Sequence, residues 1–161
     1  MTVNERTGQD AEQQARAAAL RLLARREHSR QELALKLRQR RVPADIIERV
    51  LDDYEHEGWL SDERFAGVYG RQRRDLGYGP VRIRSELHQR GVQLWPAELA
   101  EMSDSDWCEL AIRAREKRFG LASLEDDWPE KARQARFLSQ RGFSGEQVER
   151  ALEATASDST P

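Results

Sequence analysis

The chain has 161 residues, 38% apolar and 35% charged, which suits one ordinary domain or three very small ones. Its formal net charge of −2 argues against a uniformly basic protein that coats DNA, and a lone cysteine, Cys108, excludes an internal disulfide. A lone cysteine favours a reducing compartment, and neither a signal-peptide core nor a run of roughly 20 apolar residues is present, so we expect a cytoplasmic protein that does not enter the membrane.

The first 12 residues are polar, and we expect a disordered tail there. Helical spacing of apolar residues then begins, and the sequence predicts a three-helix module over residues 13–58. Ser29 and Glu32 have the spacing of a capping box at the start of the second helix, and Gly58 suits the end of the third.

A second module, residues 59–104, repeats this order. Ser61 is placed to cap its first helix. Its second helix has the clearest limits in the chain, because Gly79 and Pro80 suit a helix start and Gly91 supplies a left-handed residue at the end. We expect its third helix to be short.

The third module is predicted over residues 105–154. Its first two helices are separated by an acidic loop, the longest inside any module. Ser144 and Gln147 form another capping box, at the start of the last helix. Residues 155–161 have the composition of a disordered tail.

A short pattern recurs at the end of each second helix: Gln, Arg, a helix-ending residue and an apolar residue. It begins at Gln39, Gln89 and Gln140, which are 50 and 51 positions apart, and only the first copy has Arg41 where the others have glycine. A fixed period of this size indicates a tandem array. No run of alternating β-branched residues indicates a strand. We therefore predict an all-α fold of nine helices in three tandem three-helix modules that depend on their neighbours for stability.

Charge is unevenly distributed along the chain. Residues 16–41 carry nine basic and two acidic side chains, whereas residues 92–161 carry nine basic and fourteen acidic ones. Arginine beside an aromatic residue suits phosphates and single-stranded bases, but equally an acidic protein groove, and an Arg-rich helix can also be a solvated face. The residues that we take as candidates for partner contact are Arg38, Arg40, Arg41, Arg71, Arg73, Arg74, Tyr78, Arg82, Arg84 and Arg90.

Three-helix modules could also be helix-turn-helix units, in which the last helix reads DNA bases. The predicted third helices at residues 43–56 and 144–154 are acidic, and DNA phosphates would repel them. The three histidines lack metal-ligand spacing and no catalytic pattern is present, so we predict no catalytic, cofactor or metal residue and no enzyme.

Three segments of the second module form a distinctive combination: Trp-Leu-Ser-Asp-Glu-Arg-Phe-Ala at residues 59–66, Gly-Tyr-Gly-Pro at 77–80, and Arg-Ile-Arg-Ser-Glu-Leu-His-Gln-Arg-Gly at 82–91. In these segments the chain closely resembles bacterial RecX proteins. Shorter motifs at 24–29 with 32–33 in the first module, and at 106–108, 136–138 and 141–143 in the third, extend the resemblance to about residues 13–154. The departure is Arg41, which enters a left-handed conformation less easily than glycine.

This resemblance implies an elongated, curved array of modules and a negative regulator of the RecA recombinase. RecX-like proteins bind RecA–DNA filaments in the groove or at the end and suppress ATP hydrolysis, strand exchange and LexA cleavage. It implies the RecA filament and, weakly, single- or double-stranded DNA as partners. We expect a monomer, and we expect the ten candidates to contact RecA or DNA. The alternative is a helix-turn-helix-like DNA-binding protein that acts without RecA.

Overall fold

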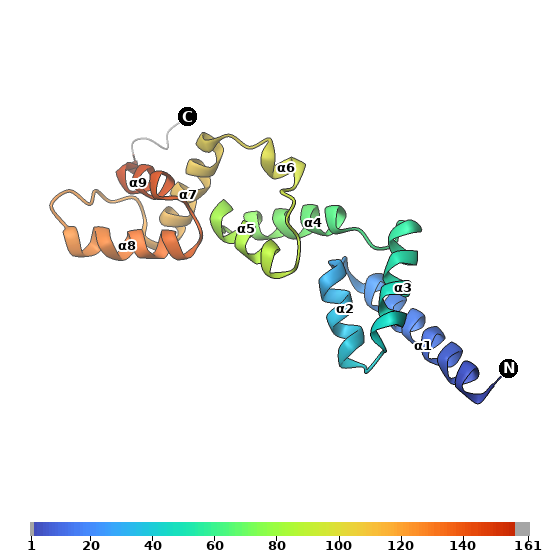
Figure 1. Ribbon diagram of the computed structural model, residues 1–161. Helices are drawn as coiled ribbons and strands as arrows, with labels where there is room; N and C mark the ends of the chain where they lie inside the picture. Colours follow the sequence, from blue (N-terminus) through green and yellow to red (C-terminus); the bar gives the residue numbers. More distant parts are fainter. Residues whose placement is uncertain (1, 157–161) are drawn as a thin grey trace. The chain divides into compact units, whose positions relative to one another are not determined.

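The chain is all-helical over the residues that the structure, a computed structural model, describes, which are 2–156 (Figure 1). No strand occurs in this range, so the predicted fold class and the predicted helix order are confirmed. The nine helices of this range are α1 (Val3–Arg25), α2 (Arg30–Gln39), α3 (Ala44–His56), α4 (Asp62–Asp75), α5 (Pro80–Gln89), α6 (Ala97–Ala100), α7 (Asp104–Phe119), α8 (Trp128–Gln140) and α9 (Gly145–Glu153).

The first helix starts earlier than its apolar spacing indicates, and residues 3–12, expected to form a tail, are helical. The Thr2 hydroxyl accepts a hydrogen bond from the Glu5 amide while the Glu5 carboxylate accepts one from the Thr2 amide, so a capping box begins α1. Glu12 then accepts hydrogen bonds from Arg16 and Arg49, which connects this turn to the bundle. At the other end, residues 157–161 of the expected tail lie outside the described residues.

The described residues form two compact units, 2–68 with 87–94 and 69–86 with 95–156, hereafter unit 1 and unit 2. Helices α4 and α5 each contribute residues to both units. The module boundaries that the sequence suggests therefore stay a prediction.

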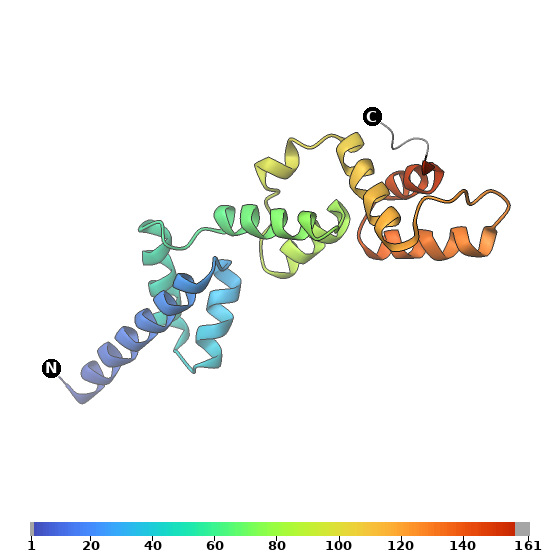
Figure 2. The same ribbon diagram turned by 180° about the vertical axis from the view of Figure 1, so that it is seen from behind.

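Unit 1 is organised around α1, α2 and α3, which form one bundle in both views (Figures 1 and 2). The predicted inward residues Leu33, Leu37 and Val50 are fully buried in its core. The Tyr54 hydroxyl donates to the Arg16 carbonyl at 2.9 Å, so the buried ring keeps its polar group satisfied. Trp59 is 49% exposed and packs edge-on against Tyr54 at 5.2 Å between ring centroids.

Unit 2 contains the bundle of α7, α8 and α9, and its core includes a fully buried charge, Arg115. This guanidinium donates to the Gln134 side chain on α8 and to the Ala122, Ala151 and Ala154 carbonyls at 2.6–3.1 Å. Burial lowers the pKa of Arg115, but an arginine stays charged at any physiological pH. Arg115, which belongs to α7, thus connects this helix to α8, to the end of α9 and to the loop that follows α7.

The recurring Gln-Arg-Gly pattern makes the contacts that join successive repeats. In unit 1 the end of α5 meets the start of α2. The Ser29 hydroxyl donates to the Arg90 carbonyl at 2.8 Å, and the side-chain amide of Gln31 donates from Nε2 to the Gln89 carbonyl at 2.9 Å. A Cβ on Gly91 would lie 2.8 Å from Cβ of Gln31, so only glycine fits without movement.

In unit 2 the end of α8 meets the start of α5 in the same way, but through backbone groups. The Gly79 amide donates to the Arg141 carbonyl at 2.7 Å, and the Val81 amide donates to the Gly142 carbonyl at 2.9 Å. These are amides of a helix start, which have no partner within their own helix. The end of the second helix in one module therefore caps the start of the second helix in the preceding module.

Glycine is required on both sides of this second junction. A Cβ on Gly142 would lie 2.6 Å from the backbone nitrogen of Arg82, and one on Gly79 would lie 2.5 Å from the Gly142 carbonyl carbon. The Arg82 guanidinium adds a hydrogen bond to the Gln140 carbonyl at 2.9 Å.

The helix ends themselves are alike in all three copies. Arg41, Gly91 and Gly142 have φ of 64°, 78° and 97°, and the next amide in each copy donates to the carbonyl five residues earlier. This is the hydrogen bond of a Schellman motif. Arg41 is exposed and no helix start is docked on it within the described chain, so a side chain is tolerated there at the cost of an unfavourable φ.

Candidate recognition surfaces

Three of the predicted candidates, Arg73, Tyr78 and Arg82, come together in unit 2. The guanidinium carbons of Arg73, Arg82 and Arg141 lie 3.9, 4.5 and 4.8 Å from the centroid of the Tyr78 ring. Each distance is within the range of a cation–π contact. The Tyr78 ring is therefore an internal platform for arginines from three segments and is not a free stacking surface.

Glu86 completes this cluster by accepting hydrogen bonds from Tyr69, Arg73 and Arg82 at 2.6, 2.9 and 3.0 Å. Burial alone would raise the pKa of Glu86, but these three donors outweigh burial and lower it. The Nε atom of Arg73 is buried with no hydrogen-bond partner within residues 2–156. Arg73 and Arg82 thus serve mainly to position α5, which the charge pattern alone could not reveal.

The other candidates of the second repeat also have partners. Arg71 and Arg74 lie 3.2 and 3.7 Å from carboxylate oxygens of Glu98, which ties α4 to the segment containing α6. The Arg84 guanidinium lies 4.4 Å from the Trp95 ring centroid. Arg71 and Arg84 remain exposed enough to meet a partner as well.

The end of α2 carries the least engaged candidates. Arg38, Arg40 and Arg41 are exposed, and none of them has an ion pair or a hydrogen bond from its side chain in the described chain. Leu35, one turn earlier, is 49% exposed. We call Leu35, Arg38, Arg40 and Arg41 the α2-end surface. Its exposed cations and one large apolar side chain are what an acidic, partly apolar partner needs.

Arg90, the remaining candidate, belongs to the first junction, where its Nε lies 3.9 Å from Glu32. The structure therefore does not gather the ten candidates into one site. It brings Arg73, Tyr78 and Arg82 together in unit 2 and Arg38, Arg40 and Arg41 together in unit 1. Whether any of the ten contacts RecA or DNA stays a prediction.

The acidic third helix α3 is partly neutralised within unit 1. Arg30 reaches Glu48, Asp52 and Glu55 at 2.7, 2.8 and 2.9 Å. Burial alone would lower the pKa of Arg30, but these carboxylates raise it. These ion pairs hold α2 against α3. The surface of α3 nevertheless remains acidic, whereas a helix that reads DNA bases needs side chains that can approach the phosphates.

Two findings concern residues 2–156 as a whole. No three His, Cys, Asp or Glu side chains gather there as metal ligands. None of the helices described is both long and apolar enough to cross a bilayer.

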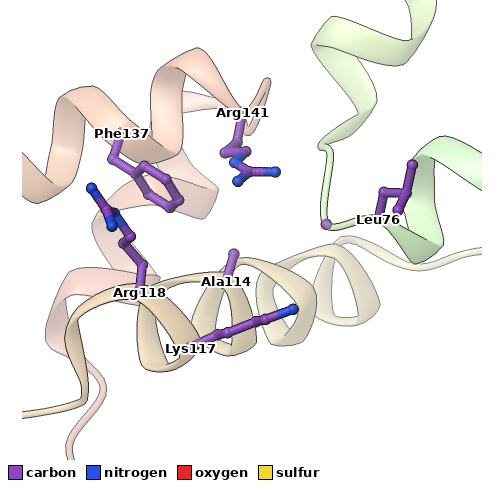
Figure 3. Close-up of a pocket in the computed structure, with 7 residues that line it drawn as sticks. Leu76, Ala114, Lys117, Arg118, Phe137 and Arg141 are labelled. Carbon is purple, nitrogen blue, oxygen red and sulfur yellow. The ribbon is translucent and has the colours of Figure 1, made fainter.

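One feature of unit 2 was missed from the sequence. The end of α7 and the end of α8 enclose an open pocket of about 220 Å³ (Figure 3). In this view Phe137 and Arg141 extend toward α7, and Arg118 extends from α7 toward Phe137. The sequence shows one sign of this pocket, the adjacent cations Lys117 and Arg118 at the end of a helix. No nearby residue in the sequence indicates that they lie beside α8. The lining consists of Leu76, Gly77, Ala114, Lys117, Arg118, Phe137 and Arg141.

Comparison with known proteins gives consistent family matches. Models of the first, second and third three-helix domains of RecX match residues 15–53, 61–93 and 104–152. The Regulatory protein RecX of Halorhodospira halophila is 46% identical, covering 92% of each chain, and that of Pseudomonas savastanoi pv. phaseolicola is 44% identical over 89% of this chain and 92% of the relative. The crystal structure of RecX from Lactobacillus salivarius shares the fold, with a TM-score of 0.71 and 22% identity over 89% of this chain and 95% of that one.

Proposed function

The chain belongs to the RecX family of regulatory proteins, and from this premise we propose that it is a negative regulator of the RecA recombinase. It binds RecA–DNA filaments in the groove or at the end, and it inhibits ATP hydrolysis, strand exchange and LexA cleavage. The observation that carries this proposal is the match to all three RecX domains in order, together with relatives named as regulatory proteins over nine-tenths of their length.

We assign the first contact with the filament to the α2-end surface. The guanidinium groups of Arg38, Arg40 and Arg41 have no internal partner in the described residues, so they can bind carboxylates or phosphates without breaking a contact within the fold. The arginines around Tyr78 differ because their partners include Glu86, and reversing their charge would disturb unit 2 itself.

The test is the DNA-dependent ATP hydrolysis of RecA, titrated with this protein. We expect inhibition, and the ratio at which it occurs separates the two modes. Inhibition by few molecules per filament indicates end-blocking, whereas inhibition only near one molecule per few subunits indicates groove occupancy. Unchanged hydrolysis at saturating protein would contradict the proposal, and tight, strongly salt-dependent binding to bare DNA would favour the helix-turn-helix alternative.

The surface assignment is tested with a double charge reversal, Arg38→Glu with Arg40→Glu. It should raise the concentration for half-inhibition by about tenfold or more and weaken its salt dependence. The matched control reverses Arg113 and Arg136, which are also exposed and have no ion pair in the described chain. Equal inhibition by the two double variants would exclude the α2-end surface.

A further inference from the structure

The pocket between α7 and α8 combines an apolar floor with a cationic rim. Phe137, Ala114 and Leu76 supply the apolar part, and Leu76 is 63% exposed. The Phe137 ring is held edge-on against Phe119, at 5.2 Å between centroids and an interplanar angle of 87°, so the floor is preformed. Its volume of about 220 Å³ is below the roughly 300–1,000 Å³ of sites for drug-sized ligands. The pocket therefore suits one apolar side chain.

The rim carries three cations, Lys117, Arg118 and Arg141. None of them has an ion pair with a carboxylate within residues 2–156. The guanidinium of Arg141 lies 5.0 Å from the Phe137 centroid and that of Arg118 lies 6.0 Å from it, so both are held beside the floor by the ring. This contrasts with the other arginines of unit 2 near α5, where Arg73 and Arg82 share Glu86.

The composition of the lining restricts the ligand. Its side chains offer hydrogen-bond donors and apolar surface but no acceptor, whereas the edges of nucleobases present donors as well as acceptors. Carboxylates on both sides of an apolar side chain satisfy all three cations and the floor together.

We propose that this pocket binds a short acidic segment of a partner protein, with one leucine or similar apolar side chain on Phe137 and flanking carboxylates on Lys117, Arg118 and Arg141. The site lies wholly in unit 2 and is distinct from the α2-end surface. It adds a second protein-binding site to the chain, and it does not depend on which protein supplies the segment.

The test uses the full chain and a fluorescein-labelled peptide, Asp-Glu-Leu-Glu-Asp, in a fluorescence anisotropy titration at low salt. We expect saturable binding with one peptide per chain, changed by less than about threefold in Arg38→Glu with Arg40→Glu, because the α2-end surface also carries cations but the assigned site is the pocket. Lys117→Glu with Arg118→Glu should weaken binding by about tenfold or more, because both charges face the ligand. Arg113→Glu with Arg136→Glu carries the same charge change outside the pocket and should weaken binding by less than about threefold.

Two further measurements separate pocket binding from general charge attraction. A peptide with glycine in place of leucine should bind several-fold more weakly, and Ala114→Leu, which fills the floor without changing charge, should weaken binding of the leucine peptide alone. Absence of saturable binding, equal effects of the two double variants, or displacement of the peptide by oligothymidylate at lower concentration than by unlabelled peptide would each overturn the proposal. Because RecA is absent from the titration, its failure would leave the proposed function intact.

Discussion

The two junctions use the same repeated pattern but differ in what they place against it. In unit 1 the end of α5 meets the side chains of Ser29 and Gln31, whereas in unit 2 the end of α8 meets the backbone of Gly79 and Val81. Side-chain atoms beyond Cβ can rotate away from a misfit, but Cβ and the backbone atoms of a helix start move only when the helix itself shifts. A similar sequence thus produces an adjustable junction in one unit and a rigid one in the other.

The largest effect that this comparison predicts is for Gly142→Ala. The new Cβ would overlap backbone atoms of Arg82, so α5 or α8 must move, and we expect a loss of about 3 kcal/mol or more in the stability of unit 2. Gly91→Ala in unit 1 should cost less, about 1–2 kcal/mol, because its nearest contact, Oε1 of Gln31, can turn aside and only Cβ of Gln31, at 2.8 Å, requires a small shift of the α2 start. Urea unfolding with hydrogen exchange of α8 and α2 amides measures both.

The controls for this prediction are Gly120→Ala and Gly58→Ala. Both glycines have φ near +80°, but a Cβ added at either would have no atom within 4 Å. These variants therefore measure only the cost of placing alanine at a positive φ, about 1 kcal/mol. If Gly142→Ala cost no more than Gly120→Ala, the backbone contact would not be rigid.

The second prediction concerns Glu86, which fixes the arginines beside the rigid junction. Glu86→Gln removes the charge that Arg73 and Arg82 share and should destabilise unit 2 by about 2 kcal/mol. Amide exchange on α5 should quicken, while exchange on α1 and α3 should stay unchanged. Equal loosening of α1 and α3 would show that the effect is not local to this junction.

The third prediction is a pH effect on the adjustable junction, where buried His28 precedes Ser29. Burial and nearby Lys36 lower the pKa of His28, and Lys36 lies 3.2 Å from its Nε2. The unfolded chain therefore binds a proton first as the pH falls, and stability should decrease below about pH 6.5 by at most about 1.4 kcal/mol per pH unit.

Thermal unfolding between about pH 7.5 and pH 5.5 measures this slope, because carboxylates titrate mostly at lower pH. His28→Gln should lose the slope and His88→Gln, at an exposed position, should keep it. A slope that survives in His28→Gln would assign it to another group.

The smallest expected effect is a gain. Arg41→Gly removes the unfavourable φ of 64° at the one copy of the pattern that has no docked helix in the described chain. Unit 1 should become more stable by about 1 kcal/mol, as seen in the urea midpoint. Arg41→Lys, which keeps a side chain and a charge, is the control and should change stability little. No gain in the glycine variant would mean that Arg41 makes a compensating contact.

Local features of this chain could be predicted, whereas contacts between distant segments could not. The capping boxes of Ser29 and Ser144 and the start of α5 at Pro80 depend on residues within one turn, so the sequence reveals them directly. The start of α1 at Thr2 is also local, but its first turns lack the apolar spacing used to find helices.

The functions of the arginines depend on tertiary structure. Arg115 follows Trp107 and Ala111 at intervals of four, so it lies on the buried face of α7, yet its partners come from three other segments. Likewise, no local rule distinguishes Arg82, which is held by Glu86, from Arg38, which has no partner in residues 2–156. Charge clusters in a sequence therefore indicate a binding surface only after internal partners have been identified.

The side chain of Arg41 has a consequence for assembly. Gly91 and Gly142 each leave room for the start of another helix of this chain, α2 and α5 respectively. A glycine at position 41 would leave the same room on the end of α2, where the helix start of a second molecule could dock. Head-to-tail recruitment of that kind has no natural end and leads to fibres. We expect an arginine there to hinder such recruitment, at the energetic cost of its unfavourable φ.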